Sequence, residues 1–279
     1  MAINPNGVDV ESVEQAIAAA LEEFYNSLLQ KIDTINIEDV LKRKNPYLYR
    51  AKAMQSASEI VENVLSATVS SSEETIFGNC FFEPLAIAAS GGVKALAEGI
   101  DITVDDRPEN TIHAIAVKSG PSVFNADSKK RQEQNFNAGR KLAQQAHAIY
   151  DPIIGYGYGK KRSSGKGTPK IYRELAGQDF WEELTGDHDF YLKIITYMGN
   201  KPELYLDKYR DSYNKASNRL IKQFTAQFCD AEGNIDWNSL VKFNSGYDSR
   251  SAEDSAKTNG TFQYDYNVAL ETDRAADKK

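Results

Sequence analysis

Two neighbouring segments of alternating hydrophobicity constrain the fold of this chain more than any other feature. In residues 100–105, apolar side chains alternate with polar ones, which is the periodicity of a β-strand. Residues 106–110 have the composition of a turn, and residues 112–118 again follow a period of two. We therefore expect a β-hairpin whose open end brings Asp101 and Lys118 close together.

Asp101 and Lys118 combine two groups with a defined chemistry. A carboxylate can hold a divalent cation against a phosphate, while a neighbouring ammonium stabilises negative charge that develops on the phosphate oxygens. This combination is typical of a metal-dependent phosphodiesterase. Two isolated residues of these types also form ordinary surface ion pairs, so the interpretation depends on the motifs around them.

Helical periodicity covers most of the remaining chain. Apolar residues at helical spacing predict helices over 10–32, 37–42, 54–69, 71–89, 128–148, 180–184, 190–198 and 203–228. The fourth of these is expected to begin at a capping box of Ser71 and Glu74 and to end at Gly91 and Gly92. Residues 149–159 predict a further strand. This order predicts an α/β fold, with a small mixed β-sheet flanked by helices.

The chain is long enough to form one large domain, which we expect over residues 1–244. It would comprise a helical N-terminal part at 1–70, a core at about 71–175 and a helical C-terminal part at 176–244. Residues 245–279 are polar and poor in aliphatic side chains, which predicts a mobile tail.

Charge is distributed unevenly along the chain. The net charge of −7 argues against a protein that binds polyanions over its whole surface. Residues 1–40 hold eight acids and one base, residues 41–52 hold five bases and no acid, and residues 129–173 hold eleven bases and two acids. Two local positive surfaces are therefore expected despite the acidic total.

Several classes of protein are disfavoured by the sequence. The longest apolar runs are too short to cross a membrane, and the N-terminus lacks the pattern of a secretory signal. Cys80 and Cys229 are too few and too far apart for a metal cluster or a disulfide framework. The spaced glycines Gly155, Gly157 and Gly159 follow a predicted strand, but no helix opens after them, so they only weakly indicate dinucleotide binding.

Motifs in three segments resemble the PD-(D/E)XK nuclease superfamily and, within it, the type II restriction endonucleases. These motifs are Phe81-Phe82-Glu83, Gly99-Ile100-Asp101 and Val117-Lys118-Ser119-Gly120. Flanking stretches that are similar to one bacterial branch of these enzymes lie at 44–52, 72–78, 178–181 and 236–244. The resemblance spans about residues 38–245 and implies a restriction-endonuclease-like core with helical N- and C-terminal additions.

The resemblance implies Mg²⁺-dependent, sequence-specific hydrolysis of double-stranded DNA. Asp101 would be the central metal ligand, Glu83 a second carboxylate on the preceding helix, and Lys118 the group that orients the attacking water and stabilises the pentacovalent phosphate. A bacterial cytoplasmic location and a cognate DNA methyltransferase, as a genetic partner, are also implied. A palindromic target would favour a homodimer, with the C-terminal helices as its expected contact.

One position departs from the superfamily pattern. An Asp or Glu normally stands two residues before the lysine, and Ala116 occupies that position here. The metal site would then be completed by Glu83, by Glu74 if its helix breaks at Gly78 or Pro84, or by Glu133 on the following helix. The alternative is a non-catalytic DNA-binding protein with a degenerate site. A structure-specific repair or recombination nuclease also stays open.

Two basic groups are expected to contact DNA phosphates. The first, expected near the catalytic residues, comprises Lys42, Arg43, Lys44, Tyr47, Arg50 and Lys52. The second lies in a loop and comprises Lys160, Lys161, Arg162 and Lys166. Lys129, Lys130 and Arg131, at the start of a predicted helix, are further candidates.

Overall fold

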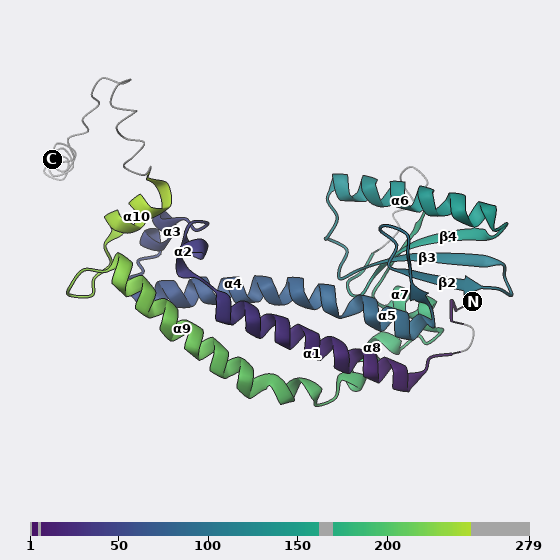
Figure 1. Ribbon diagram of the computed structural model, residues 1–279, viewed down its shortest axis with the longest axis horizontal. Helices are drawn as coiled ribbons and strands as arrows, with labels where there is room; N and C mark the ends of the chain where they lie inside the picture. Colours follow the sequence, from purple (N-terminus) through teal and green to yellow (C-terminus); the bar gives the residue numbers. More distant parts are fainter. Residues whose placement is uncertain (1, 5–6, 162–169, 247–279) are drawn as a thin grey trace, which may run out of the picture.

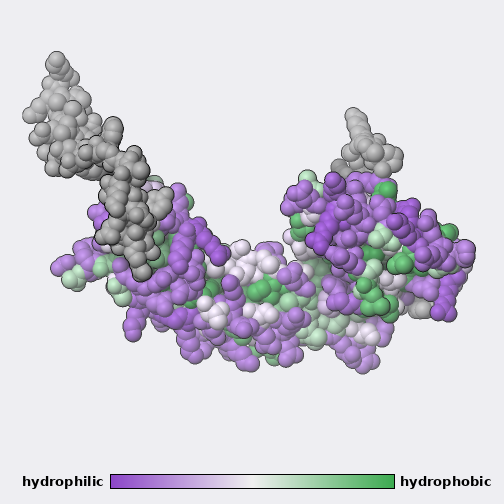
Figure 2. Space-filling model, turned by 45° about the horizontal axis from the view of Figure 1, so that its top comes forward, coloured by the Kyte–Doolittle hydropathy of each residue, from purple (hydrophilic) through white to green (hydrophobic). Residues whose placement is uncertain are grey.

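The fold consists of two lobes joined by an arm of three long helices (Figure 1). The computed structural model describes residues 2–4, 7–161 and 170–246. The arm is formed by α1 (Val10–Thr34), α4 (Ala57–Cys80) and α9 (Leu206–Phe228). Both lobes stand on the same side of the arm, so they enclose a concave space (Figures 1 and 2).

The first lobe, here called the sheet lobe, contains five strands and four helices of the described residues. Its strands are β1 (Val93–Lys94), β2 (Ile102–Asp106), β3 (Thr111–Lys118), β4 (Ile149–Tyr156) and β5 (Arg173–Ala176). Its helices are α5 (Phe82–Ser90), α6 (Ala126–Gln145), α7 (Gln178–Thr185) and α8 (Phe190–Met198), and the short helix η1 (Lys201–Tyr205) leads from it into α9.

The strands are ordered β1-β2-β3-β4-β5 in a mixed sheet. The pairs β1–β2 and β2–β3 are antiparallel, whereas β3–β4 and β4–β5 are parallel, with α6 as the crossover between β3 and β4. The predicted hairpin and the predicted mixed sheet are both confirmed. The two edge strands were not predicted, because strands of two and four residues are too short to show a hydrophobic period.

Each face of the sheet packs against helices, which explains the alternation along β3. Ile115 and Val117 point into a core formed with α1, α5, α7 and α8. Ala114 and Ala116 point to the opposite face, where Phe136 of α6 covers the sheet. Small residues on this second face let α6 lie close to the strands. The catalytic candidates at the strand ends are therefore carried by a rigid, three-layered scaffold.

The spaced glycines of β4 and its end serve the packing of aromatic rings. A Cβ atom built on Gly155 would lie 2.0 Å from Cε2 of Phe180, and one on Gly157 would lie 2.1 Å from Cδ1 of Phe82. Both distances are far below any real carbon–carbon contact. The absence of a side chain at these positions thus allows helices α5 and α7 to approach the strand.

We predict that Gly155→Ala destabilises the protein by about 1–3 kcal/mol, because Phe180 is fully buried and has no room to move. Urea denaturation followed by circular dichroism measures the loss. The double variant with Phe180→Leu should be less destabilised than the sum of the single variants, because leucine removes the ring atoms that clash. Simple additivity of the two free-energy changes would contradict this explanation.

The predicted helix start at Ser71 is wrong. Helix α4 runs unbroken through this position, and its capping box is formed by Ser56 and Glu59 instead. Ser72 and Thr75 donate their hydroxyl groups to carbonyls one turn earlier, at 2.8 and 3.0 Å, so they are accommodated inside the helix. The helix ends at Cys80, and α5 begins at Phe82, with Phe81 between them still in the right-handed helical conformation.

The second lobe, here called the distal lobe, lies at the other end of the arm. It contains α2 (Ile37–Leu41), α3 (Pro46–Ala51) and α10 (Trp237–Ser245). Its core is a separate apolar cluster that includes Leu28 of α1, Leu65 of α4 and Phe224 of α9. The predicted mobile tail at 245–279 falls almost entirely outside the described residues. Within the described residues, no helix is long and apolar enough to cross a membrane.

Candidate active site

Asp101 and Lys118 meet at the open end of the hairpin, as the strand pattern predicts. Asp101 directly precedes β2, and Lys118 is the last residue of β3. Lys118 Nζ donates to Asp101 Oδ2 at 3.2 Å and to the carbonyl oxygen of Val117 at 2.8 Å. The same carboxylate oxygen accepts the backbone N–H of Val117 at 2.6 Å, which fixes the orientation of the Asp101 side chain.

These two residues line a pocket whose other wall is formed by the end of α4 and the start of α5. The pocket is lined by Glu74, Thr75, Gly78, Asn79, Glu83, Asp101, Val117, Lys118, Ser119, Val123 and Tyr158. Since β2 points away from the distal lobe, this end of the hairpin faces the concave space (Figure 1). Three carboxylates, those of Glu74, Glu83 and Asp101, thus line the same pocket as Lys118.

Glu74, near the end of α4, and Glu83, at the start of α5, line the same pocket. In one straight helix, residues nine positions apart would lie half a turn out of phase. The two helices are separated at Phe81, and not at Gly78 or Pro84, and both glutamates line the pocket. The burial of Phe81 and Phe82 in the sheet-lobe core holds the two helices at this junction.

Lys94 is a neighbour of this site that the sequence did not reveal. Its ammonium lies 3.0 Å from Oε1 of Glu83, and this carboxylate raises the pKa of Lys94 through a hydrogen bond and its charge. Lys94 lies on the two-residue strand β1, which pairs with the start of β2 beside Asp101. Only the pairing of strands places it here, since nothing in the local sequence marks it.

The third candidate for the missing carboxylate, Glu133, and the position of Ala116 both lie away from the pocket. Glu133 is absent from the lining of the pocket and faces Tyr172, where burial and the charges of Glu174 and Glu133 raise the pKa of the Tyr172 phenol to about 12. Ala116 is completely buried beneath α6 among apolar side chains. The pocket therefore draws its extra carboxylates from α4 and α5.

The two basic groups are placed in different lobes. The group at 42–52 belongs to the distal lobe, at the end of α4 remote from the pocket, so the expectation that it lies near Asp101 is wrong. From Ala57, where α4 begins, to Glu74, where it reaches the pocket, the helix rises by about 26 Å. Lys160 and Lys161 follow β4 in the sheet lobe. Arg162 and Lys166 lie outside the described residues.

The basic turn of the distal lobe is held by α10. The side-chain amide of Asn244 donates to the carbonyl oxygens of Leu41 at 2.9 Å and Lys44 at 2.8 Å. Arg50 lies over the ring of Trp237, with 5.6 Å between its guanidinium carbon and the ring centroid. Because the backbone of the turn is tied to α10, its cationic side chains are presented from a fixed support.

Comparison with known proteins supports this architecture. The sequence profile of the type II restriction endonuclease EcoO109I family matches residues 11–204, a range that includes α1, α4, the entire sheet and the pocket. A search of curated proteins found no match. The matched range holds most of the chain, and the mixed sheet between helices agrees with a restriction-endonuclease-like core. The chain therefore belongs to the EcoO109I family of type II restriction endonucleases.

Proposed function

We propose that this protein hydrolyses phosphodiester bonds of double-stranded DNA at specific sequences in a Mg²⁺-dependent reaction. The observation that carries the proposal is the convergence of Asp101, Glu83 and Glu74 with Lys118 around one pocket at the end of the hairpin. The family match makes DNA the expected substrate. A DNA methyltransferase would protect the host, and a cytoplasmic homodimer is the assembly we propose.

The donor set of the pocket fits a magnesium ion. Carboxylate oxygens are hard ligands, and Mg²⁺ is usually held by one or two of them together with water and substrate phosphates. Within the described residues, no group of three or more His, Cys, Asp or Glu side chains is arranged to hold a metal ion. We therefore propose Asp101 as the main ligand, with Glu83 or Glu74 as the second and DNA completing the site.

The bound ion would make a coordinated water more acidic and neutralise charge on the phosphate. The remaining chemistry belongs to the chain. Lys118 is held between the carboxylate of Asp101 and the carbonyl of Val117, so its ammonium has a fixed position at the pocket. From there it would orient the attacking water and stabilise the additional negative charge of the pentacovalent phosphate.

DNA is proposed to lie in the concave space between the lobes. The end of the hairpin that carries Asp101 and Lys118 lies on the side of the sheet lobe toward the distal lobe (Figure 1), which stands across the concave space (Figure 2). The rise of α4 from its start to the pocket, about 26 Å to Glu74 and about 36 Å to its end, is comparable to one turn of B-DNA. The basic residues of the distal lobe would thus contact phosphates about one helical turn from the bond that is cleaved.

This arrangement predicts that Arg43→Gln weakens DNA binding without slowing the chemical step. Removal of one phosphate contact should raise the Kd several-fold. It should also reduce the magnitude of the negative slope of log K against log salt by about one. The single-turnover cleavage rate at saturating enzyme should stay unchanged. Fluorescence anisotropy and a quenched-flow assay provide the two readouts.

Lys215→Gln is the matched control for Arg43→Gln. Lys215 is an exposed base on α9, where it pairs with Asp211, and α9 lies on the side of the arm away from the concave space (Figure 1). We expect its replacement to leave the affinity for DNA unchanged. Equal losses of affinity in both variants would contradict the proposed path of the DNA.

The decisive experiment is incubation of the purified protein with unmethylated phage DNA and Mg²⁺. Discrete fragments, absent when EDTA replaces Mg²⁺, are the expected result, and sequencing of their ends gives the recognition site. Cleavage confined to branched or nicked DNA would instead identify a structure-specific nuclease. Binding of duplex DNA without cleavage in Mg²⁺ or Mn²⁺ would show that the site is degenerate.

A further inference from the structure

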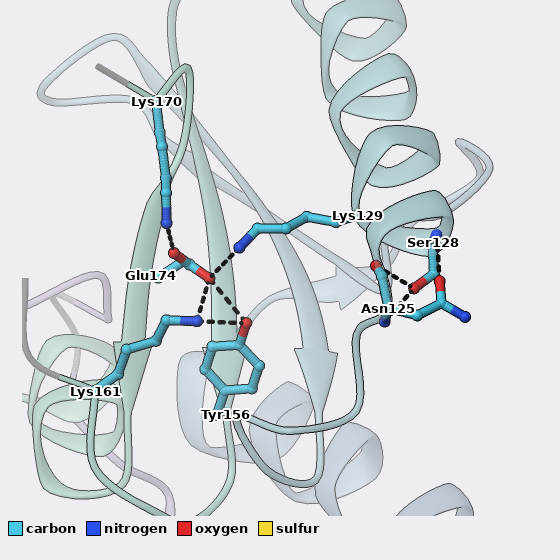
Figure 3. Close-up of polar contacts among 7 residues, drawn as sticks. All are labelled: Asn125, Ser128, Lys129, Tyr156, Lys161, Lys170 and Glu174. Carbon is cyan, nitrogen blue, oxygen red and sulfur yellow. Dashed lines mark hydrogen bonds and ion pairs between the residues drawn. The ribbon is translucent and has the colours of Figure 1, made fainter. Parts of the chain in front are cut away.

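A cluster of three lysines surrounds one buried carboxylate beside the proposed active site (Figure 3). The carboxylate is that of Glu174 on β5, whose side chain is only 6% exposed. Lys161 Nζ lies 2.5 Å from Glu174 Oε1, Lys129 Nζ lies 3.9 Å from the same oxygen, and Lys170 pairs with Oε2. Tyr156 donates its hydroxyl group to Oε1 at 2.9 Å.

The three lysines come from three separate parts of the sheet lobe. Lys129 lies in the first turn of α6, Lys161 follows β4 and Lys170 precedes β5. Burial opposes ionisation of Glu174, but hydrogen bonds from Lys161, Lys170 and Tyr156 outweigh it and lower the pKa of Glu174 to about 2. Glu174 is therefore a permanent anion that holds these segments together.

The three ammonium groups of the cluster exceed the single negative charge of Glu174. One ammonium would neutralise Glu174, and among the described residues none of the three lysines has another carboxylate partner. The side chains of Lys129 and Lys170 are 37% and 43% exposed, so their ammonium groups reach solvent. Counted with Glu174 alone, the three lysines carry an excess of two positive charges, and Glu133, which faces Tyr172 beside Lys170, offsets one of them.

The position of Lys129 adds to this excess. The N-terminus of a helix carries a partial positive charge and favours acidic side chains in its first turn. Here Asn125 and Ser128 cap α6 reciprocally, at 2.8 and 3.0 Å, Asp127 is the acidic residue of the first turn, and Lys129 follows directly after Ser128 (Figure 3). A lysine at this place is unfavourable for the helix alone, whereas it is favourable when an anion binds there.

The cluster adjoins the catalytic pocket through the sheet. Tyr156 is paired with Lys118 across β3 and β4, and neighbouring strands are about 4.8 Å apart. Consecutive phosphates of one DNA strand follow each other closely, so an anion site one or two strands from Lys118 is placed for a phosphate next to the one that is cleaved.

We propose that Glu174 is a positioning residue that gathers Lys129, Lys161 and Lys170 into a binding site for a DNA backbone phosphate beside the catalytic pocket. This inference rests on the proposed function, because it takes DNA as the ligand. It assigns to a buried carboxylate the role of strengthening the binding of a polyanion.

The test uses the sign of the effect of Glu174→Gln on DNA affinity. If Glu174 only contributed negative charge, its neutralisation would tighten the binding of DNA. If it positions the lysines, their mutual repulsion separates them, and the Kd should rise about tenfold while the salt slope falls by at least one. The probe is a fluorescein-labelled 30-base-pair duplex of arbitrary sequence, with the full chain in EDTA.

Glu98→Gln is the matched control. Glu98 belongs to the same lobe and pairs with Arg131 of α6, but both side chains are 73% exposed. Its replacement removes the same charge from an ion pair and should leave binding unchanged or tighter. Thermal denaturation of each variant shows whether the fold is kept.

Lys170→Gln provides a second test that does not touch the buried carboxylate. Loss of this exposed ammonium should lower the salt slope by about one. An unchanged Kd and slope for Lys170→Gln, or tighter binding by folded Glu174→Gln, would overturn the inference. Because no metal is present, a catalytically inactive wild type still reports on this site, whereas a wild type that binds no duplex refutes the proposed function as well.

Discussion

Asp101→Asn is expected to reduce DNA cleavage by about a thousandfold, equivalent to about 4 kcal/mol of transition-state stabilisation. Asparagine has nearly the same shape and can still accept the N–H of Val117 through its side-chain oxygen, so the hairpin end should keep its structure. The negative charge that would hold the cation is lost. Single-turnover cleavage in Mg²⁺ measures the rate, and anisotropy without metal shows that DNA binding persists.

Asp105→Asn serves as the control for Asp101→Asn. Asp105 lies on β2 near the turn, at the opposite end of the strand from the pocket, where it contacts Arg107. This variant loses the same charge, from β2 itself rather than from the residue that precedes it, and its cleavage rate should match that of the wild type. Retention of more than a tenth of the wild-type rate by Asp101→Asn would place the catalytic centre elsewhere.

Lys118→Met is expected to lower the maximal cleavage rate about a hundredfold while the affinity for DNA changes little. Methionine retains much of the apolar stem but cannot donate to Asp101 or stabilise charge on the phosphate. The partly exposed ion pair contributes little to folding, so thermal stability should be nearly unchanged. The separation of rate from affinity distinguishes a role in the transition state from one in binding.

Lys141→Met gives the comparison for Lys118→Met. Lys141 is an exposed lysine of α6, outside the lining of the pocket, so its replacement removes the same charge without touching the proposed chemistry. We expect wild-type cleavage rates at saturating enzyme. A loss of affinity in Lys118→Met that accounts for its whole defect would assign this residue to DNA binding instead.

The hairpin and the long helices α1 and α9 could be predicted because their information is local. Alternation along β2 and β3 gives both the strands and the meeting of Asp101 with Lys118. The break between α4 and α5 was not predictable at its true position. Serines and acids at 71–74 have the composition of a helix start, but the hydroxyl groups bond within the helix and the apolar face continues past them.

Some residues of the candidate site could likewise be predicted from the sequence, and others could not. Asp101 and Lys118 follow from the strand period, whereas Glu83 as a member of the site depended on the family resemblance. Lys94 and the cluster around Glu174 had no sequence pattern, since their contacts join segments that are distant along the chain or belong to strands of two and four residues. The remote position of the first basic group followed only from the length of α4.

The division of the apolar interior has a consequence for how the protein responds to heat. The sheet lobe and the distal lobe have separate cores, and among the described helices only α1 contributes buried residues to both, with Ile17 in one and Ile32 in the other. Cooperative unfolding follows contiguous packing. The distal core can therefore melt while the sheet remains folded, which would leave an assembled catalytic pocket that has lost its second hold on the duplex.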